Sequence, residues 1–202
     1  MDEYHKKLKK IWDNGGGWGG VYYGVFSNFI KEKKFKICAE VGIGYGFHAE
    51  EILKNTELDK LYLIDPSRPY PNDQFSTDVT SNGGFEDLVK NIKNLLIPYK
   101  ERYTWFRTPS LEITNDQIPD ESLDAVFLDG DHSYQAVKQD LPFWWKKIKK
   151  GGYILGDDYA SCHPGCKRAV NEFSKNMKLP LKFLSKENST HPGYPIYVFE
   201  KQ

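Results

Sequence analysis

The stretch KFKICAEVGIGYGFHAEEILKN, residues 34–55, is the part of the sequence from which the fold can be worked out. Its first part is apolar and strand-like up to Val41, and residues 47–55 have the apolar spacing of a helix. Three glycines lie between them at alternate positions, Gly42, Gly44 and Gly46. Glycines between a strand and a helix let the backbone turn sharply and approach a ligand closely. The stretch therefore predicts a strand, a ligand-binding turn and a helix.

The rest of the chain continues this alternation of strands and helices. Further strands are expected at residues 60–67, 102–108, 123–130 and 151–158, and two closing strands at 181–187 and 193–201. Helices are expected at 85–99, 133–150 and 166–177, the second with a kink or restart at Pro142. Strands that alternate with helices predict an α/β fold, in which a parallel sheet is covered by helices on both faces.

Composition narrows the classes of protein to consider. The 202 residues include 28 Lys and Arg and 28 Asp and Glu, so the formal net charge is zero and a nucleic-acid partner is not expected. There is no run of about 18 apolar residues to span a bilayer, and the polar first residues do not resemble a signal peptide. Three cysteines are too few for a disulfide framework. We expect a cytoplasmic protein that binds no membrane.

Asp65 ends the second expected strand and is a candidate cofactor ligand. In parallel sheets, ligands bind outside the carboxyl ends of the strands, and an acid at this place accepts hydrogen bonds from ribose hydroxyls. A plain turn with a helix-capping acid is the alternative. A dinucleotide fingerprint needs glycine at the sixth position from Gly42, where this chain has Phe47. The pattern therefore favours a nucleoside cofactor other than NAD.

Further acids follow the fourth and fifth expected strands. Asp129 ends the fourth strand, and Asp157 and Asp158 end the fifth. If these strands are neighbours, three carboxylates converge and repel one another, and a hard divalent cation relieves that repulsion. The alternative is that the pair at 157–158 forms a capping turn. Asp131 is expected to cap the helix that follows it.

The segment from Glu40 to Gly46, with an acid followed by glycines at alternate positions, resembles the first motif of class I S-adenosylmethionine-dependent methyltransferases. The order of elements from about Phe35 to Glu200 is similar to that family. The resemblance implies a Rossmann-like, doubly wound, mostly parallel seven-stranded sheet with an antiparallel last strand. It also implies that the cofactor is bound by Glu40, Gly42, Gly44, Gly46, Asp65, Ser110 on the adenine side, and Asp129.

The acids after strands four and five resemble those of metal-dependent small-molecule O-methyltransferases, in particular the sugar-hydroxyl branch with the macrocin and mycinamicin enzymes. The resemblance implies that Asp129, Asp157 and Asp158 bind a divalent cation such as Mg²⁺, and that His132 is the catalytic base. A bound cation lowers the pKa of a hydroxyl, and a neutral imidazole can take its proton. The alternative is that His132 is a surface histidine.

Residues 1–34 are expected to form a leader ahead of a methyltransferase domain at 35–202. Its glycine-rich part contains Trp18, Tyr22 and Tyr23, which would close over an organic substrate, unless the leader touches nothing. The expected partner is a small hydroxylated molecule, and a homo-oligomer is left open. The alternative functions are a methyltransferase of this fold that uses no metal and a non-catalytic domain that binds the cofactor.

Overall fold

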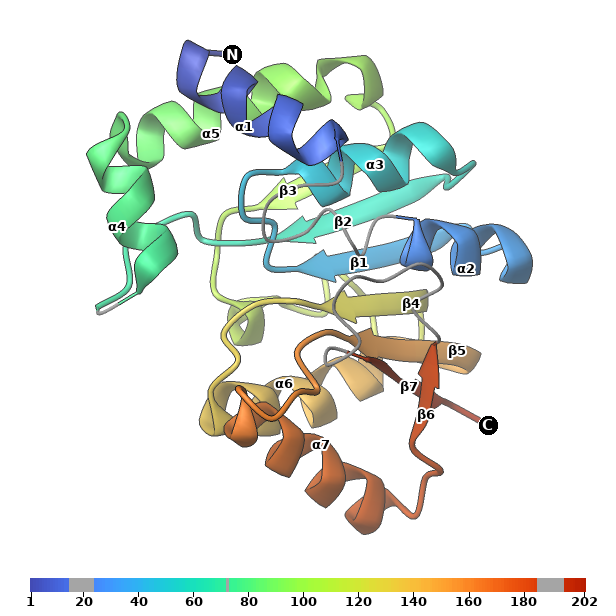
Figure 1. Ribbon diagram of the computed structural model, residues 1–202. Coiled ribbons are helices and arrows are strands. Elements are labelled where there is room, and N and C mark those ends of the chain that lie inside the picture. The colour runs from blue at the N-terminus through green and yellow to red at the C-terminus, as the bar shows by residue number, and fades with distance from the viewer. Residues whose placement is uncertain (15–23, 72, 185–194) are drawn as a thin grey trace.

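The computed structural model describes residues 1–14, 24–71, 73–184 and 195–202, and its centre is a sheet of seven strands (Figure 1). The strands are β1 (Ile37–Val41), β2 (Lys60–Ile64), β3 (Tyr103–Phe106), β4 (Leu123–Leu128), β5 (Ile148–Gly156), β6 (Lys182–Leu184) and β7 (Ile196–Glu200). Their order in the sheet is β3-β2-β1-β4-β5-β7-β6, and β7 runs antiparallel to both of its neighbours. The predicted Rossmann-like sheet with an antiparallel last strand is confirmed.

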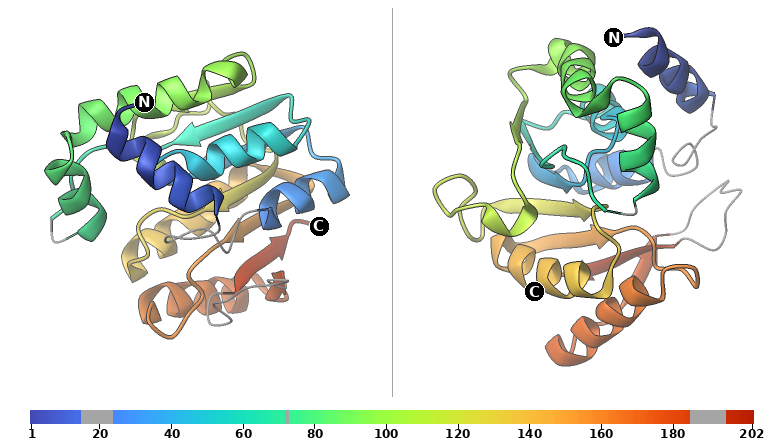
Figure 2. Two further views of the ribbon diagram at one scale, coloured as in Figure 1. Left: turned by 45° about the horizontal axis from the view of Figure 1, so that its top comes forward. Right: turned by 90° about the vertical axis from the view of Figure 1, so that its left-hand side faces the viewer.

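Helices cover both faces of the sheet (Figure 2). They are α1 (Glu3–Asp13), α2 (Val25–Lys33), α3 (Phe47–Asn55), α4 (Gln74–Ser81), α5 (Gly84–Leu96), α6 (Tyr134–Lys147) and α7 (Pro164–Met177). One hydrophobic cluster joins the sheet to α2, α3 and α5, and a second joins the other face to α6 and α7. Fully burying each large apolar side chain in these clusters contributes about 1.5–3 kcal/mol, so the two clusters hold the three layers together.

The register of the central strands aligns their carboxyl ends. Val41 of β1 pairs with Leu128 of β4, and Leu128 pairs in turn with Gly156 of β5. The next residue on each strand is Gly42, Asp129 or Asp157. Three segments far apart in the sequence therefore meet at one edge of the sheet, as the pattern of strands predicted.

Three helices were not expected from the sequence, namely α1, α2 and α4. The first two lie within residues 1–34, so the alternative that this leader touches nothing is wrong for these helices. In α2, Phe26 and Ile30 are buried in the core. Trp18, Tyr22 and Tyr23 lie outside the described residues. Among the helices that are described, none has the length and apolar character needed to cross a membrane.

Helix α6 runs through Pro142 as one helix, so of the kink or restart that was expected, the restart is wrong and the kink stays a prediction. Leu141 and Trp144 on either side of the proline are fully buried. Their packing holds the helix against the sheet and offsets the hydrogen bond that proline cannot donate. Residues 148–150, expected to end this helix, belong instead to β5.

Arg102 secures the connection between α3 and β2. Its guanidinium donates hydrogen bonds to three carbonyl oxygens, those of Leu53 at 2.7 Å, Thr56 at 2.7 Å and Leu58 at 2.9 Å. Arg102→Lys should lower the free energy of unfolding by about 1–3 kcal/mol in a denaturant titration, because one ammonium cannot replace the planar fork of donors.

The matched control is Arg107→Lys, which alters an exposed ion pair with Glu86. This control should change the free energy of unfolding by less than about 0.5 kcal/mol. An equal decrease in the free energy of unfolding in the two variants would show that the three hydrogen bonds of Arg102 to carbonyl oxygens add no more stability than an exposed ion pair.

Candidate active site

The glycine turn after β1 is packed on one side and open on another. Gly42 has φ 83°, and a Cβ atom added there would lie 2.1 Å from the carbonyl oxygen of Asp129, so only glycine fits. Gly44 has φ 47°, and a Cβ atom there would meet no atom within 4 Å. The turn is therefore seated against the loop after β4 and has free space for a ligand beside Gly44.

Asp65 ties the end of β2 to this turn. Its Oδ2 accepts a hydrogen bond of 2.9 Å from the backbone N–H of Ile43, and its Oδ1 accepts one of 2.6 Å from the N–H of Ser67. The predicted ribose ligand thus lies directly beside the glycine turn. Its contact with a ribose stays a prediction.

Glu40 contacts a residue that the sequence analysis left unassigned. Its carboxylate lies 2.8 Å from Nδ1 of His48 in the first turn of α3, and both side chains are buried. Burial lowers the pKa of His48, but the neighbouring Glu40 carboxylate outweighs this and raises it to about 9. The two form an ion pair behind the glycine turn. No spacing in the sequence distinguishes His48 from an ordinary helical residue.

Ser110 lies in the short helix η2 (Ser110–Glu112) after β3. Its hydroxyl donates to Oδ1 of Asp140 at 2.5 Å and accepts from Nε1 of Trp144 at 2.8 Å. The predicted position on the adenine side therefore has its hydroxyl bonded to two side chains of α6. The role of Ser110 toward adenine stays a prediction.

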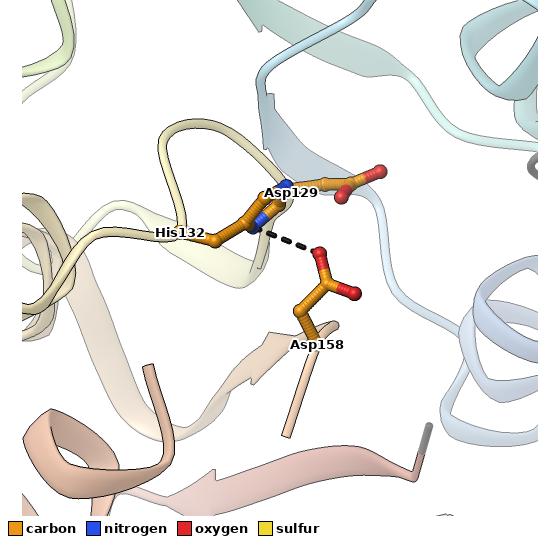
Figure 3. A group of neighbouring side chains, drawn as sticks. All are labelled: Asp129, His132 and Asp158. Carbon is orange, nitrogen blue, oxygen red and sulfur yellow. Dashed lines mark ion pairs between the residues drawn. The ribbon is translucent and has the colours of Figure 1, made fainter. Parts of the chain in front are cut away.

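Asp129, His132 and Asp158 form a compact group at the carboxyl ends of β4 and β5 (Figure 3). One potential ligand atom from each lies within 4.8 Å of the others. Nδ1 of His132 is 2.9 Å from Oδ2 of Asp158, and Nε2 of His163 is 3.5 Å from Oδ1 of the same carboxylate. His163 was left unassigned from the sequence, because its place near Asp158 depends on how the chain turns into α7.

The backbone of Asp158 adopts a conformation that side-chain-bearing residues rarely take. Its φ is 58°, in the left-handed region. Such a conformation in a residue other than glycine costs about 1–3 kcal/mol and is often found at functional sites. The carboxylate of this residue lies 2.9 Å from Nδ1 of His132.

Charge is concentrated in this group. Burial, followed by repulsion from Asp157, raises the pKa of Asp129 well above its usual range. Burial lowers the pKa of His132, but its hydrogen bond to Asp158 and the nearby carboxylates raise it to about 9. The raised pKa values of Asp129 and His132 therefore both reduce the net negative charge of this group.

The residues present fit a divalent cation. Carboxylate oxygens suit hard cations such as Mg²⁺ and Mn²⁺, and an imidazole nitrogen within 4.8 Å of them would favour Zn²⁺ over Mg²⁺. This group contains His132 where the sequence analysis expected Asp157. Asp157 is buried, its N–H donates to the carbonyl of Leu128, and its charge raises the pKa of Asp129. Its role as a ligand stays a prediction.

Asp131 does not cap α6, so that expectation is wrong. The helix begins at Tyr134, and the capping residue is Ser133, whose side chain accepts a hydrogen bond from the N–H of Ala136. Asp131 lies two residues earlier and accepts a hydrogen bond of 2.8 Å from the N–H of Ser133. It therefore forms a small turn ahead of the cap, on the rim of a small hollow that His132 and Asp157 also line.

Asp140 should make stability depend on pH. Burial raises its pKa to about 6, although the hydrogen bond from Ser110 lowers it. The unfolded carboxyl titrates near 4, so the folded state binds more protons between pH of about 4 and 6 and loses stability as pH rises through this range. Asp140→Asn keeps an acceptor for Ser110 and should raise the melting temperature at pH 8, with a gain that shrinks toward pH 5. A variant that melts lower than the unaltered protein at pH 8 would contradict this.

Comparisons with known proteins indicate the family of this chain. Residues 39–159 match the family model described as a methyltransferase domain. An uncharacterized protein of Acanthamoeba polyphaga mimivirus is 28% identical over 165 residues, which make up 75% of this chain and 67% of that protein. The demethyldecarbamoylnovobiocin O-methyltransferase of Streptomyces niveus is 32% identical over 91 residues, 44% of this chain and only 32% of that enzyme.

The fold agrees as well. A solved O-methyltransferase of Bacillus cereus in complex with SAH superposes with a TM-score of 0.66 over 100% of this chain and 92% of its own, at 11% identity. The family match covers more than half of the sequence, from β1 to the residue after Asp158, and so includes the glycine turn, Asp65 and the acid group. This chain therefore belongs to the methyltransferase-domain family.

Proposed function

We propose that the protein transfers a methyl group from S-adenosylmethionine to a hydroxyl of a small molecule, such as a sugar or glycoside, with a divalent cation and with His132 as base. Membership of the methyltransferase family supports S-adenosylmethionine as the donor. The relative from Streptomyces niveus, an O-methyltransferase by name, supports a hydroxyl acceptor. The observation that carries the proposal is the group of Asp129, His132 and Asp158 beside the glycine turn.

The cofactor would be held by the turn and by Asp65. S-adenosylmethionine supplies a methyl group on a sulfonium, which is already a good leaving group. The open side of Gly44 leaves room for the methionine part, and Asp65 offers carboxylate oxygens to the ribose hydroxyls. The Cα of Gly42 packs on the backbone of Asp129. This contact supports a reacting methyl group close to the acids.

The acceptor hydroxyl would be bound and activated at the acid group. Asp129, Asp157 and Asp158 would hold the cation, which would lower the pKa of a bound hydroxyl. His132 belongs to the same group of side chains, which supports its role in taking the hydroxyl proton. The remaining task of the protein is to align oxygen and methyl group.

One observation favours a second candidate, a methyltransferase of the same fold that uses no metal. The bond of 2.9 Å between His132 and Asp158 is the arrangement in which a carboxylate orients an imidazole base. In this candidate the acids orient His132 and the acceptor without a cation, and turnover should rise with pH toward the His132 pKa of about 9, because only the neutral imidazole accepts a proton. A chelation experiment separates the two candidates.

Binding of the cofactor tests the first part of the proposal. S-adenosylhomocysteine should raise the melting temperature, because a ligand at 100 times its Kd stabilises the native state by about 2.7 kcal/mol. Asp65→Ala should lower the affinity for this ligand at least about tenfold, because a hydrogen bond to a charged group contributes about 1.5–3 kcal/mol. The control Asp59→Ala removes an exposed acid ahead of β2 and should leave the affinity unchanged. Binding of NAD without any response to S-adenosylhomocysteine would contradict the proposal.

The acid group and the base are tested together. In Mn²⁺ titrations followed by electron paramagnetic resonance, Asp158→Asn should lose Mn²⁺ binding. The control Asp116→Asn changes an exposed acid in the loop before β4 and should keep Mn²⁺ binding.

His132→Ala should lower turnover of an identified acceptor by about 10²–10⁴-fold, the usual effect of losing a general base, with unchanged affinity for S-adenosylhomocysteine. Full turnover after exhaustive chelation would favour the metal-free candidate. Full turnover by His132→Ala would show that His132 is not the base in either candidate.

A further inference from the structure

Helix α1 packs against the residues that surround the glycine turn. His5 of α1 is 2% exposed, and its ring contacts the rings of Tyr45 and Phe47, with centroids 6.0 and 4.9 Å away. Trp12 at the other end of α1 contacts Phe47 at 5.1 Å. Figures 1 and 2 show α1 lying beside α3 and α5. The polar start of the chain is thus attached next to the cofactor turn.

A single carboxylate links α1 directly to that turn. The hydroxyls of Tyr4 in α1 and Tyr45 in the turn both donate to Oδ2 of Asp78 in α4. Tyr45 stands between Gly44 and Gly46, and α4 belongs to the segment that follows Asp65. Asp78 therefore joins three parts of the chain, two of which carry expected cofactor ligands.

Both ends of α1 make further contacts with the domain. The backbone N–H of Asp2 donates to Oδ1 of Asn91 in α5 at 2.8 Å, and Lys9 pairs with Glu50 in α3 at 3.4 Å. A helix of 11 residues is marginal by itself in water. The contacts with the domain are therefore what keep α1 helical, and undocking of α1 amounts to local unfolding.

We propose that α1 is a cover whose docking is coupled to cofactor binding, with Tyr45 as the positioning residue between them. When Tyr4 and His5 are in place, Tyr45 is held and the turn keeps the backbone shape that the cofactor meets. The coupling is reciprocal, so the bound cofactor stabilises docked α1 by the same factor by which docked α1 strengthens cofactor binding. The inference rests on the proposed S-adenosyl cofactor.

Limited digestion with trypsin measures docking of α1 directly. The helix contains Lys6, Lys7, Lys9 and Lys10, and the next basic residue is Lys31, so early loss of a short N-terminal peptide reports on α1 alone. Mass spectrometry follows this loss and, in the same digests, cleavage within the domain, which separates local opening from global unfolding. Saturating S-adenosylhomocysteine should slow cleavage in α1 at least about fivefold, the low end of usual coupling factors.

Tyr4→Phe removes only the hydroxyl that reaches Asp78. It should speed cleavage in α1 of the free protein and lower the affinity for S-adenosylhomocysteine in calorimetry, because docked α1 no longer reaches Tyr45 through Asp78. The matched control Tyr70→Phe alters an exposed tyrosine just ahead of α4 and should change neither quantity. A protein that binds S-adenosylhomocysteine but loses its N-terminal peptide at an unchanged rate overturns the coupling. A protein that does not bind this ligand at all overturns the cofactor assignment as well.

Discussion

Repulsion among the carboxylates at the ends of β4 and β5 is the constraint on which the site depends. The N–H of Asp129 donates to the carbonyl of Val41 and that of Asp157 to the carbonyl of Leu128, so the backbone keeps these acids together. Two like charges 4 Å apart repel by about 4 kcal/mol in a partly solvated protein site. The raised pKa of Asp129, which favours its neutral form, and the raised pKa of His132, which favours an imidazolium, both relieve this repulsion. A divalent cation would relieve it in the proposed active form.

The glycine turn connects this charged group to the cofactor. A side chain at Gly42 would collide with the backbone of Asp129, so the turn and the acids can approach only because glycine stands there. The same turn reaches α1 and α4 through Tyr45. Cofactor, acceptor and N-terminal helix would thus meet around a single segment of seven residues, from Glu40 to Gly46.

The sequence predicted those parts of the fold that have strong local patterns. Helix α3 has the predicted bounds, and the acids lie at one edge of the sheet because parallel strands in register must bring them there. Helices α1 and α4 escaped prediction because their residues are mostly polar and their stability comes from contacts such as those of His5 and Asp78. The pairing of Glu40 with His48 and the place of His163 likewise depend on contacts between elements, which periodicity does not encode.

The most direct test is a crystal structure with S-adenosylhomocysteine and Mn²⁺, with anomalous scattering used to locate the metal. The account predicts nucleoside density at the glycine turn and Asp65, and an anomalous peak about 2.0–2.6 Å from carboxylate oxygens of Asp129 and Asp158, the range of hard-cation bonds to oxygen. Ordered S-adenosylhomocysteine with no anomalous peak at this edge of the sheet would contradict the claim that these acids form a cation site.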